Sequence, residues 1–126
     1  MQKKILVIDN DIDILDVMYE VLKYEGFDVK AVLHTTDIVQ LVDDYQPDLL
    51  LIDYILDGVN GGEICSQIKA QHNTTSLPVI LISAYPKADD ASKQYCCNAF
   101  ISKPFDLDHL TGQINRLLTP SAQYVN

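Results

Sequence analysis

Polar side chains that could do chemistry stand at the ends of four apolar runs. Asp9 and Asn10 follow the run "ILVI", and Asp53 follows "LLLI". Ser83 ends the run "PVILIS", and Lys103 follows "NAFIS". If these runs are neighbouring parallel strands, their carboxyl ends meet at one edge of a sheet, where ligands bind in such folds. We therefore expect these side chains to lie close together.

The residue types at this edge indicate phosphoryl chemistry with a metal ion. Two carboxylates a few Å apart repel by about 1 to 4 kcal/mol, depending on the local dielectric, and a bound cation would relieve that repulsion. Oxygen ligands such as those of Asp9 and Asn10 suit Mg²⁺. The carboxylate of Asp53 can attack phosphorus and become an acyl phosphate. Lys103 and the Ser83 hydroxyl can contact the phosphoryl oxygens.

Each of these side chains, taken singly, also has a structural explanation as a helix cap or turn residue. That explanation is the one we prefer for Asp11 and Asp13, which stand where a helix begins and are stabilised by its dipole by roughly 0.3 to 1 kcal/mol. A calcium-binding EF-hand loop is excluded, because Ile14 occupies the position that requires Gly.

The apolar runs alternate with helical patterns, which predicts an α/β fold with a parallel, doubly wound sheet covered by helices on both faces. The predicted strands cover residues 3–9, 27–33, 48–53, 78–83 and 98–102. Three helical stripes are formed by Ile12, Leu15, Met18, Tyr19 and Leu22, by Ile38, Leu41, Val42 and Tyr45, and by Leu107, Leu110, Ile114, Leu117 and Leu118.

Boundary signals complete the predicted order of elements. The first helix ends before Gly26, and Thr35 or Thr36 caps the second, which Pro47 terminates. Residues 58–62 form a loop that is followed by a short helix with Ile64, Cys65 and Ile68. A further helix between residues 84 and 97 is expected to be short or irregular.

Length and composition predict one domain of 126 residues, with a core from about 3 to 118 and a tail at 119–126. The formal net charge of −9 argues against non-specific binding to nucleic acid or to anionic lipid. Cys65, Cys96 and Cys97 have no metal-ligand spacing, and we interpret the adjacent pair as packing residues, because neighbours rarely reach disulfide geometry. With no apolar run long enough to span a bilayer, we expect a cytoplasmic protein.

The sequence resembles the receiver domain of bacterial two-component response regulators. The motifs "ILVIDND", "PDLLLIDYILDGVNGGE", "PVILISA" and "FISKPF" are similar to those of this family, in the same order, and the match runs from about Lys3 to Leu118. The resemblance implies a flavodoxin-like sheet with strand order 2-1-3-4-5.

The same resemblance implies a role for each residue of the site. Asp53 would be the phosphoacceptor, and Asp9, the side chain of Asn10, Asp53 and the main-chain carbonyl of Ile55 would hold Mg²⁺. Ser83 would be the switch hydroxyl, Lys103 its charge partner and Phe100 an aromatic that changes rotamer with it. The bond between Lys103 and Pro104 would be cis.

The implied function is to accept a phosphoryl group from a sensor histidine kinase or a histidine phosphotransfer protein, and so to switch a protein-binding surface. That surface would include the fourth helix, the fifth strand and the last helix, without direct binding of nucleic acid or membrane. The chain would be a phosphoacceptor that assists its own phosphorylation and dephosphorylation rather than an enzyme with a separate substrate.

Departures from the family pattern keep alternatives open. Asn10 stands where a carboxylate is usual, which removes one negative charge and favours a pseudo-receiver, the same fold used as a docking module without phosphorylation. Asp57 stands where a loop proline is common. A haloacid-dehalogenase-like phosphatase would also use the motif "DND" together with Ser83 and Lys103. That family needs a further acidic pair, however, and it assigns no role to Asp53.

Overall fold

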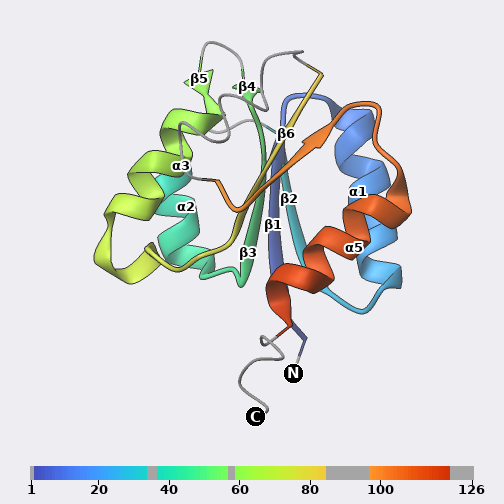
Figure 1. Cartoon of the computed structure of the whole chain (residues 1–126), viewed down its shortest axis with the longest axis horizontal. Helices are drawn as coiled ribbons and strands as arrows, with labels where there is room; N and C mark the ends of the chain where they lie inside the picture. Colours follow the sequence, from blue (N-terminus) through green and yellow to red (C-terminus); the bar gives the residue numbers. More distant parts are fainter. Residues whose placement is uncertain (1, 34–36, 57–58, 85–96, 120–126) are drawn as a thin grey trace.

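Five parallel strands form one sheet in the order β2-β1-β3-β6-β7 (Figure 1). The computed structural model describes residues 2–33, 37–56, 59–84 and 97–119. The strands of this sheet are β1 (Lys4–Asp9), β2 (Asp28–Leu33), β3 (Leu49–Asp53), β6 (Val79–Ser83) and β7 (Ala99–Ser102). When only the strands of this sheet are numbered in chain order, β6 and β7 are the fourth and fifth, and the spatial order is 2-1-3-4-5. The predicted doubly wound sheet is therefore confirmed.

Helices cover both faces of the sheet. Figure 1 shows α1 (Ile12–Tyr24) and α5 (Leu107–Leu118) on one face and α2 (Ile38–Tyr45) and α3 (Gly61–Ala70) on the other. A short antiparallel hairpin, β4 (Ile55–Leu56) and β5 (Val59–Asn60), follows β3, and a 3₁₀ turn, η1 (His72–Thr74), follows α3. The helix expected between residues 84 and 97 falls mainly on residues outside the described ranges. No helix in the described ranges is both long and apolar enough to cross a membrane.

Two apolar layers hold the sheet between the helices. Side chains of α1 and α5 pack with Leu49 and Leu51 of β3 in one layer. Side chains of α2 and α3 pack with Leu50 and Ile52 in the other. Because helices cover both faces of β3, its residues are all buried and its sequence lacks polar alternation.

The cap of α2 differs from the prediction. Helix α2 begins at Ile38, and the carboxylate of Asp37 accepts a hydrogen bond of 3.0 Å from the amide of Gln40. A cap must stand directly before the first turn for its side chain to reach these amides. The predicted cap at Thr35 or Thr36, residues that lie outside the described ranges, is therefore wrong.

The buried stripe of α1 is narrower than predicted. Leu15, Met18 and Leu22 are buried, whereas Ile12 and Tyr19 are 54% and 39% exposed. A helix turns by about 100° per residue, which places Ile12 and Tyr19 on the same side of the stripe and away from the sheet. In α5, the predicted core residue Leu107 is likewise exposed.

The glycines after β5 belong to a helix rather than to a loop. Gly61 and Gly62 form the first turn of α3, and the side-chain oxygen of Asn60 caps it by accepting from the amides of Gly62 (2.8 Å) and Glu63 (3.3 Å). The amide of Gly61 donates to the carbonyl of Tyr54 at 2.7 Å. A Cβ added at Gly61 would overlap the main-chain carbonyl of Asp53. Glycine is therefore required here for a close approach of two backbones.

We expect Gly61→Ala to lower the free energy of unfolding by about 1 to 3 kcal/mol, because the added methyl group must displace backbone. Gly112→Ala is the matched control, since a Cβ at Gly112 meets nothing within 4 Å and the residue lies inside α5. That variant should gain roughly 0.5 to 1 kcal/mol from helix propensity. Urea unfolding measures both, and equal effects of the two substitutions would contradict the close approach.

Candidate functional site

The register of the sheet brings the predicted side chains to one edge. Ile8 pairs with Ile52, so Asp9 and Asp53 are the next residues on adjacent strands. Asp53 pairs with Ile82, one residue before Ser83. Ser83 in turn pairs with Ser102, and Lys103 follows directly. The carboxyl ends of four strands therefore meet where the sequence predicts.

One ammonium group joins two buried carboxylates at this edge. The Nζ atom of Lys103 lies 3.0 Å from Oδ2 of Asp9 and 3.0 Å from Oδ2 of Asp53. The exposed fraction of the side chain is 2% for Asp9, 8% for Asp53 and 16% for Lys103. Buried charges are strongly unfavourable unless they are paired, so the shared ammonium is what allows both carboxylates to be buried side by side.

The environment of Lys103 shifts its pKa. Burial alone would lower the pKa, because it disfavours the charged ammonium. The hydrogen bonds to Asp9 and Asp53 and the charges of these carboxylates act in the opposite direction and prevail, so the pKa of Lys103 is raised. Between neutral pH and about pH 10.4, the usual lysine value, the ion pairs therefore contribute fully to stability, and their contribution is lost as the pH rises through the folded value of Lys103.

The acidic residues after β1 divide into two groups. Asp9 faces Lys103 with one oxygen, and its other oxygen, Oδ1, accepts from the amide of Asp11 at 2.9 Å. Asp11 is the N-cap of α1, and its carboxylate accepts from the amides of Asp13 (2.9 Å) and Ile14 (3.4 Å). Asp13 lies in the first turn of that helix. The predicted structural role of Asp11 and Asp13 at the helix start is confirmed.

The remaining predicted residues lie around the same edge. Asn10 is exposed directly after Asp9. The backbone of Ile55 begins the β4 hairpin, two residues after Asp53. Phe100 is half-buried on β7 against the apolar layer of α2 and α3. The bond between Lys103 and Pro104 is cis, the isomer that the resemblance implies. Asp57 lies outside the described residues.

The donor set fits a hard cation. Two buried carboxylates, Asp9 and Asp53, face one common point, which the positive charge of Lys103 now marks. Asn10 and the main chain of Ile55 stand close by in the sequence and would add neutral oxygens, as Mg²⁺ accepts. Within the described ranges, no group of three or more His, Cys, Asp or Glu side chains could hold a metal. A metal here would be held by the carboxylates of Asp9 and Asp53, with the neutral oxygens of Asn10 and Ile55 and with water.

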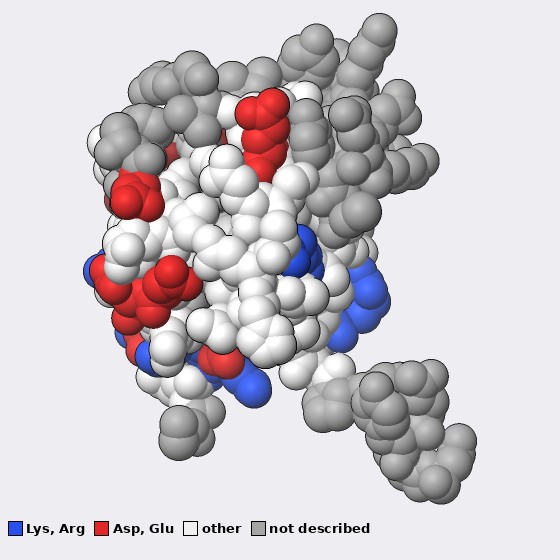
Figure 2. Space-filling model, turned by 90° about the vertical axis from the view of Figure 1, so that its left-hand side faces the viewer, with Lys and Arg blue, Asp and Glu red and all other residues white. Residues whose placement is uncertain are grey.

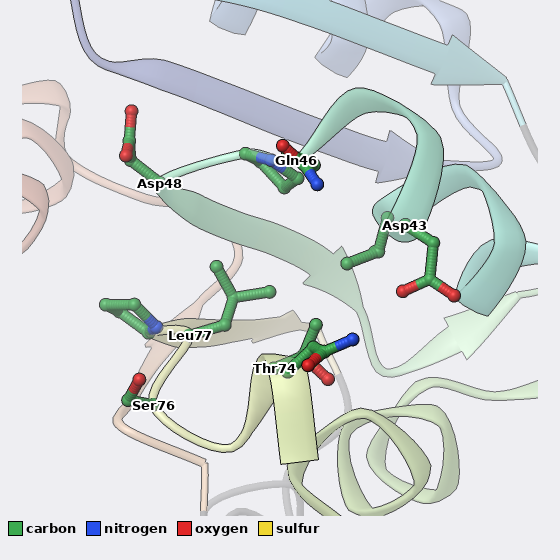
Figure 3. Close-up of a pocket in the computed structure, with 10 residues that line it drawn as sticks. Asp43, Gln46, Asp48, Thr74, Ser76 and Leu77 are labelled. Atoms are coloured by element: carbon green, nitrogen blue, oxygen red, sulfur yellow. The ribbon is translucent and has the colours of Figure 1, made fainter. Parts of the chain in front are cut away.

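A pocket of about 570 Å³ lies at the opposite end of the sheet (Figure 3). It is lined by Gln46, Asp48, Thr74 and Leu77 among others. Asp48 directly precedes β3, so the pocket is at the amino end of this strand and Asp53 is at its carboxyl end. Figure 2 shows the face formed by α2 and α3, which is largely uncharged at its centre, with acidic side chains gathered along one side. Neither feature belongs to the acidic site.

Comparison with known proteins agrees with the fold. The family model of the response regulator receiver domain matches residues 5–115. The chain belongs to this family. It is 28% identical over 117 residues to the DNA-binding dual master transcriptional regulator RpaA of Synechocystis, covering 91% of this chain and 48% of that protein.

Solved receiver structures share the fold. A CheY-like receiver domain protein from Methanospirillum hungatei has a TM-score of 0.84 at 23% identity, with 94% of each chain covered. NtrX from Brucella abortus has a TM-score of 0.80 at 30% identity, covering 94% of this chain and 26% of that one. The receiver chain spans about half the length of the curated relatives it matches.

Two contacts of this receiver were not predicted from its sequence. One is the approach of Gly61 to the Asp53 carbonyl, for which the pair of glycines was the available signal. The other is a contact of 3.0 Å between the sulfur atoms of Cys65 and Cys97. No local pattern indicates that contact, because the two cysteines meet only when α3 packs on the sheet.

Replacing Lys103 tests how much its ion pairs with Asp9 and Asp53 contribute to stability. Lys103→Met keeps a side chain of similar length and leaves two buried carboxylates without their cation. We expect the free energy of unfolding at neutral pH, without added divalent cations, to fall by about 3 to 5 kcal/mol. Lys3→Met, at an exposed position, is the control and should change stability little.

The pH dependence gives a second readout of the same variant. The stability difference between the wild type and Lys103→Met should shrink above about pH 10.4, as the wild type loses its ammonium charge. A difference below about 1 kcal/mol at neutral pH would show that these ion pairs behave like exposed ones.

Proposed function

We propose that this receiver domain accepts a phosphoryl group on Asp53 with the help of Mg²⁺. The observation that supports this most strongly is the shared contact of Lys103 with Asp9 and Asp53 at the carboxyl edge of the sheet. The carboxylate of Asp53 stands at the end of the central strand, with a second carboxylate and a cation beside it. This arrangement matches the needs of a phosphoryl acceptor: a nucleophile, an acidic pair for a metal, and a positive charge for phosphoryl oxygens.

The phosphoryl donor in this proposal is a phosphorylated histidine of a sensor kinase or a phosphotransfer protein. A carboxylate oxygen of Asp53 forms a bond to phosphorus while the bond between phosphorus and the donor imidazole nitrogen breaks. The electron pair of the broken bond stays on the imidazole nitrogen. Mg²⁺, when bound, neutralises negative charge on the phosphoryl oxygens.

The chain's own residues complete the chemistry. The ammonium of Lys103 pairs with Asp53 in this structure. It is close enough to bind a phosphoryl oxygen once Asp53 carries the phosphoryl group. The hydroxyl of Ser83, one position beyond the register partner of Asp53, would donate to another oxygen. In this scheme the domain is a phosphoacceptor that assists the gain and loss of its own phosphoryl group.

The output of the proposed switch is a change in protein binding. A phosphoryl group adds about −1.5 to −2 charge at Asp53, which draws Lys103 and Ser83 toward it. Strand β7 carries Phe100 and leads directly to Lys103, so a shift at Lys103 reaches the surface of β7 and α5. We propose this surface, with the segment between β6 and β7, as the docking site of a downstream protein.

A pseudo-receiver is the second candidate, and Asn10 favours it. An amide oxygen can bind Mg²⁺ but brings no charge, so a receiver with Asn10 holds the metal less tightly than one with a carboxylate there. The two candidates differ in whether Asp53 reacts.

Phosphorylation of Asp53 decides between them. The wild type, incubated with Mg²⁺ and acetyl phosphate, should gain the mass of one phosphoryl group, and Asp53→Asn should gain none. Asp16→Asn removes an exposed carboxylate from α1 and should leave the modification unchanged. A modification that persists in Asp53→Asn would refute the assignment, and an unmodified wild type that remains folded would favour the docking module.

Mg²⁺ affinity tests the role of Asn10. Asn10→Asp adds a charged ligand beside Asp9 and Asp53, and we expect Mg²⁺ to bind at least roughly 5-fold more tightly, since about 1 kcal/mol or more is gained. Isothermal titration calorimetry measures the affinity. Asn115→Asp, at an exposed position of α5, controls for the change in net charge. Equal affinities of the wild type and Asn10→Asp would show that residue 10 does not contact the metal.

A further inference from the structure

Two cysteines from distant segments meet beneath the face covered by α3. Cys65 lies on α3 and is fully buried, and Cys97 stands two residues before β7 and is half-buried. The thiol of Cys97 donates to the sulfur of Cys65 at 3.0 Å. A disulfide bond is about 2.05 Å long, so the sulfur atoms need to approach by only about 1 Å.

A lysine and an asparagine hold this region in place. The Nζ atom of Lys69, one helical turn after Cys65, donates to the carbonyl of Leu77 at 2.6 Å and to the side-chain oxygen of Asn98 at 2.6 Å. The same Asn98 oxygen accepts from the amide of Val79 at 2.9 Å. These bonds fix the residue after Cys97 against β6 and keep a positive charge near the thiols.

This setting favours the reactive form of Cys65. The hydrogen bond from Cys97 lowers the pKa of the Cys65 thiol, burial opposes this shift, and the charge of Lys69 supports it. The net direction is downward, and the thiolate is the form that attacks a disulfide.

We propose that Cys65 and Cys97 are a redox-active pair that forms a reversible disulfide between α3 and the start of β7 when the protein meets a small disulfide such as oxidised glutathione. The proposal does not depend on phosphorylation of Asp53. It adds a modification site in the apolar layer between the sheet and the helices α2 and α3.

The proposed exchange balances in two steps. Cys97 is the more exposed of the two thiols, and its thiolate attacks one sulfur of oxidised glutathione, forming a mixed disulfide and releasing one glutathione thiolate. The Cys65 thiolate then attacks the Cys97 sulfur and releases the second glutathione thiolate. The two cysteine protons end on the two glutathione thiols, so the protein pair is oxidised and the glutathione disulfide is reduced.

The crosslink would enclose residues 66–96, which include Ser83. It would tie a helix that covers the sheet to the segment that enters the edge strand β7. Because closing such a loop restricts the unfolded chain, the oxidised form should melt higher, by roughly 10 °C.

The test is peptide mapping of the wild type after equilibration with oxidised and reduced glutathione at several ratios, with free thiols alkylated at the end. We expect a peptide pair joined through Cys65 and Cys97, which dithiothreitol separates. Cys96→Ser should still form it, because the observed contact joins Cys65 to Cys97. Cys65→Ala and Cys97→Ser should each lose it, and circular dichroism shows whether these variants fold.

Adjacent Cys96 supplies an internal control in the wild type itself. In denaturant the two possible crosslinks to Cys65 close loops that differ by one residue, so they should form about equally. In the folded protein the Cys65–Cys97 crosslink should dominate. A wild type that stays reduced in excess oxidised glutathione, that stops at the mixed disulfide, or that links Cys65 to Cys96 when folded would overturn the proposal.

Discussion

The contact of one lysine with two buried carboxylates is the interaction on which the site depends. Asp9 and Asp53 end adjacent strands, and their burial would be strongly unfavourable without the ammonium of Lys103 between them. Lys103 comes from the far end of the chain, so the contact links β1, β3 and the residue after β7 in one charge network. A charged group that binds beside Asp53 would therefore change the balance of charge in this network.

The two apolar layers determine where these charges stand. Because the sheet is buried on both faces, its register is fixed, and the strand ends cannot slide relative to one another. The hairpin after β3 returns the chain so closely that Gly61 lies against the carbonyl of Asp53. Asp11 caps α1 locally and leaves Asp9 to face the site. The packed strands and helices thus hold the charged residues in place at the edge of the sheet.

The layer that carries Phe100 also carries the two cysteines. Cys65, Cys97 and Phe100 pack within the same apolar cluster between the sheet and the helices α2 and α3. Lys69 and Asn98 connect this cluster to β6 and to the residues just before it: Asn98 accepts from the amide of Val79, and Lys69 donates to the carbonyl of Leu77 and to Asn98. The segment that enters β7 is therefore connected both to the acidic edge, through Lys103, and to α3, through the thiol contact.

The sequence by itself determined the five strands of the parallel sheet, their order along the chain and the residues at their ends, because apolar runs and the polar residues that follow them are local signals. It also indicated the role of Asp11, since capping acts within one turn. It did not predict the short β4–β5 hairpin. Local signals failed at Gly61 and Gly62, which were predicted as a loop: they form the first turn of α3, where Gly61 lies against the main-chain carbonyl of Asp53. Only the tertiary structure brought Lys103 between Asp9 and Asp53 at 3.0 Å and set the cysteine sulfur atoms in contact. The reason is that these distances depend on strand register and on helix packing. Both bring together residues that are far apart in the chain, and neither produces a local sequence pattern that could be recognised.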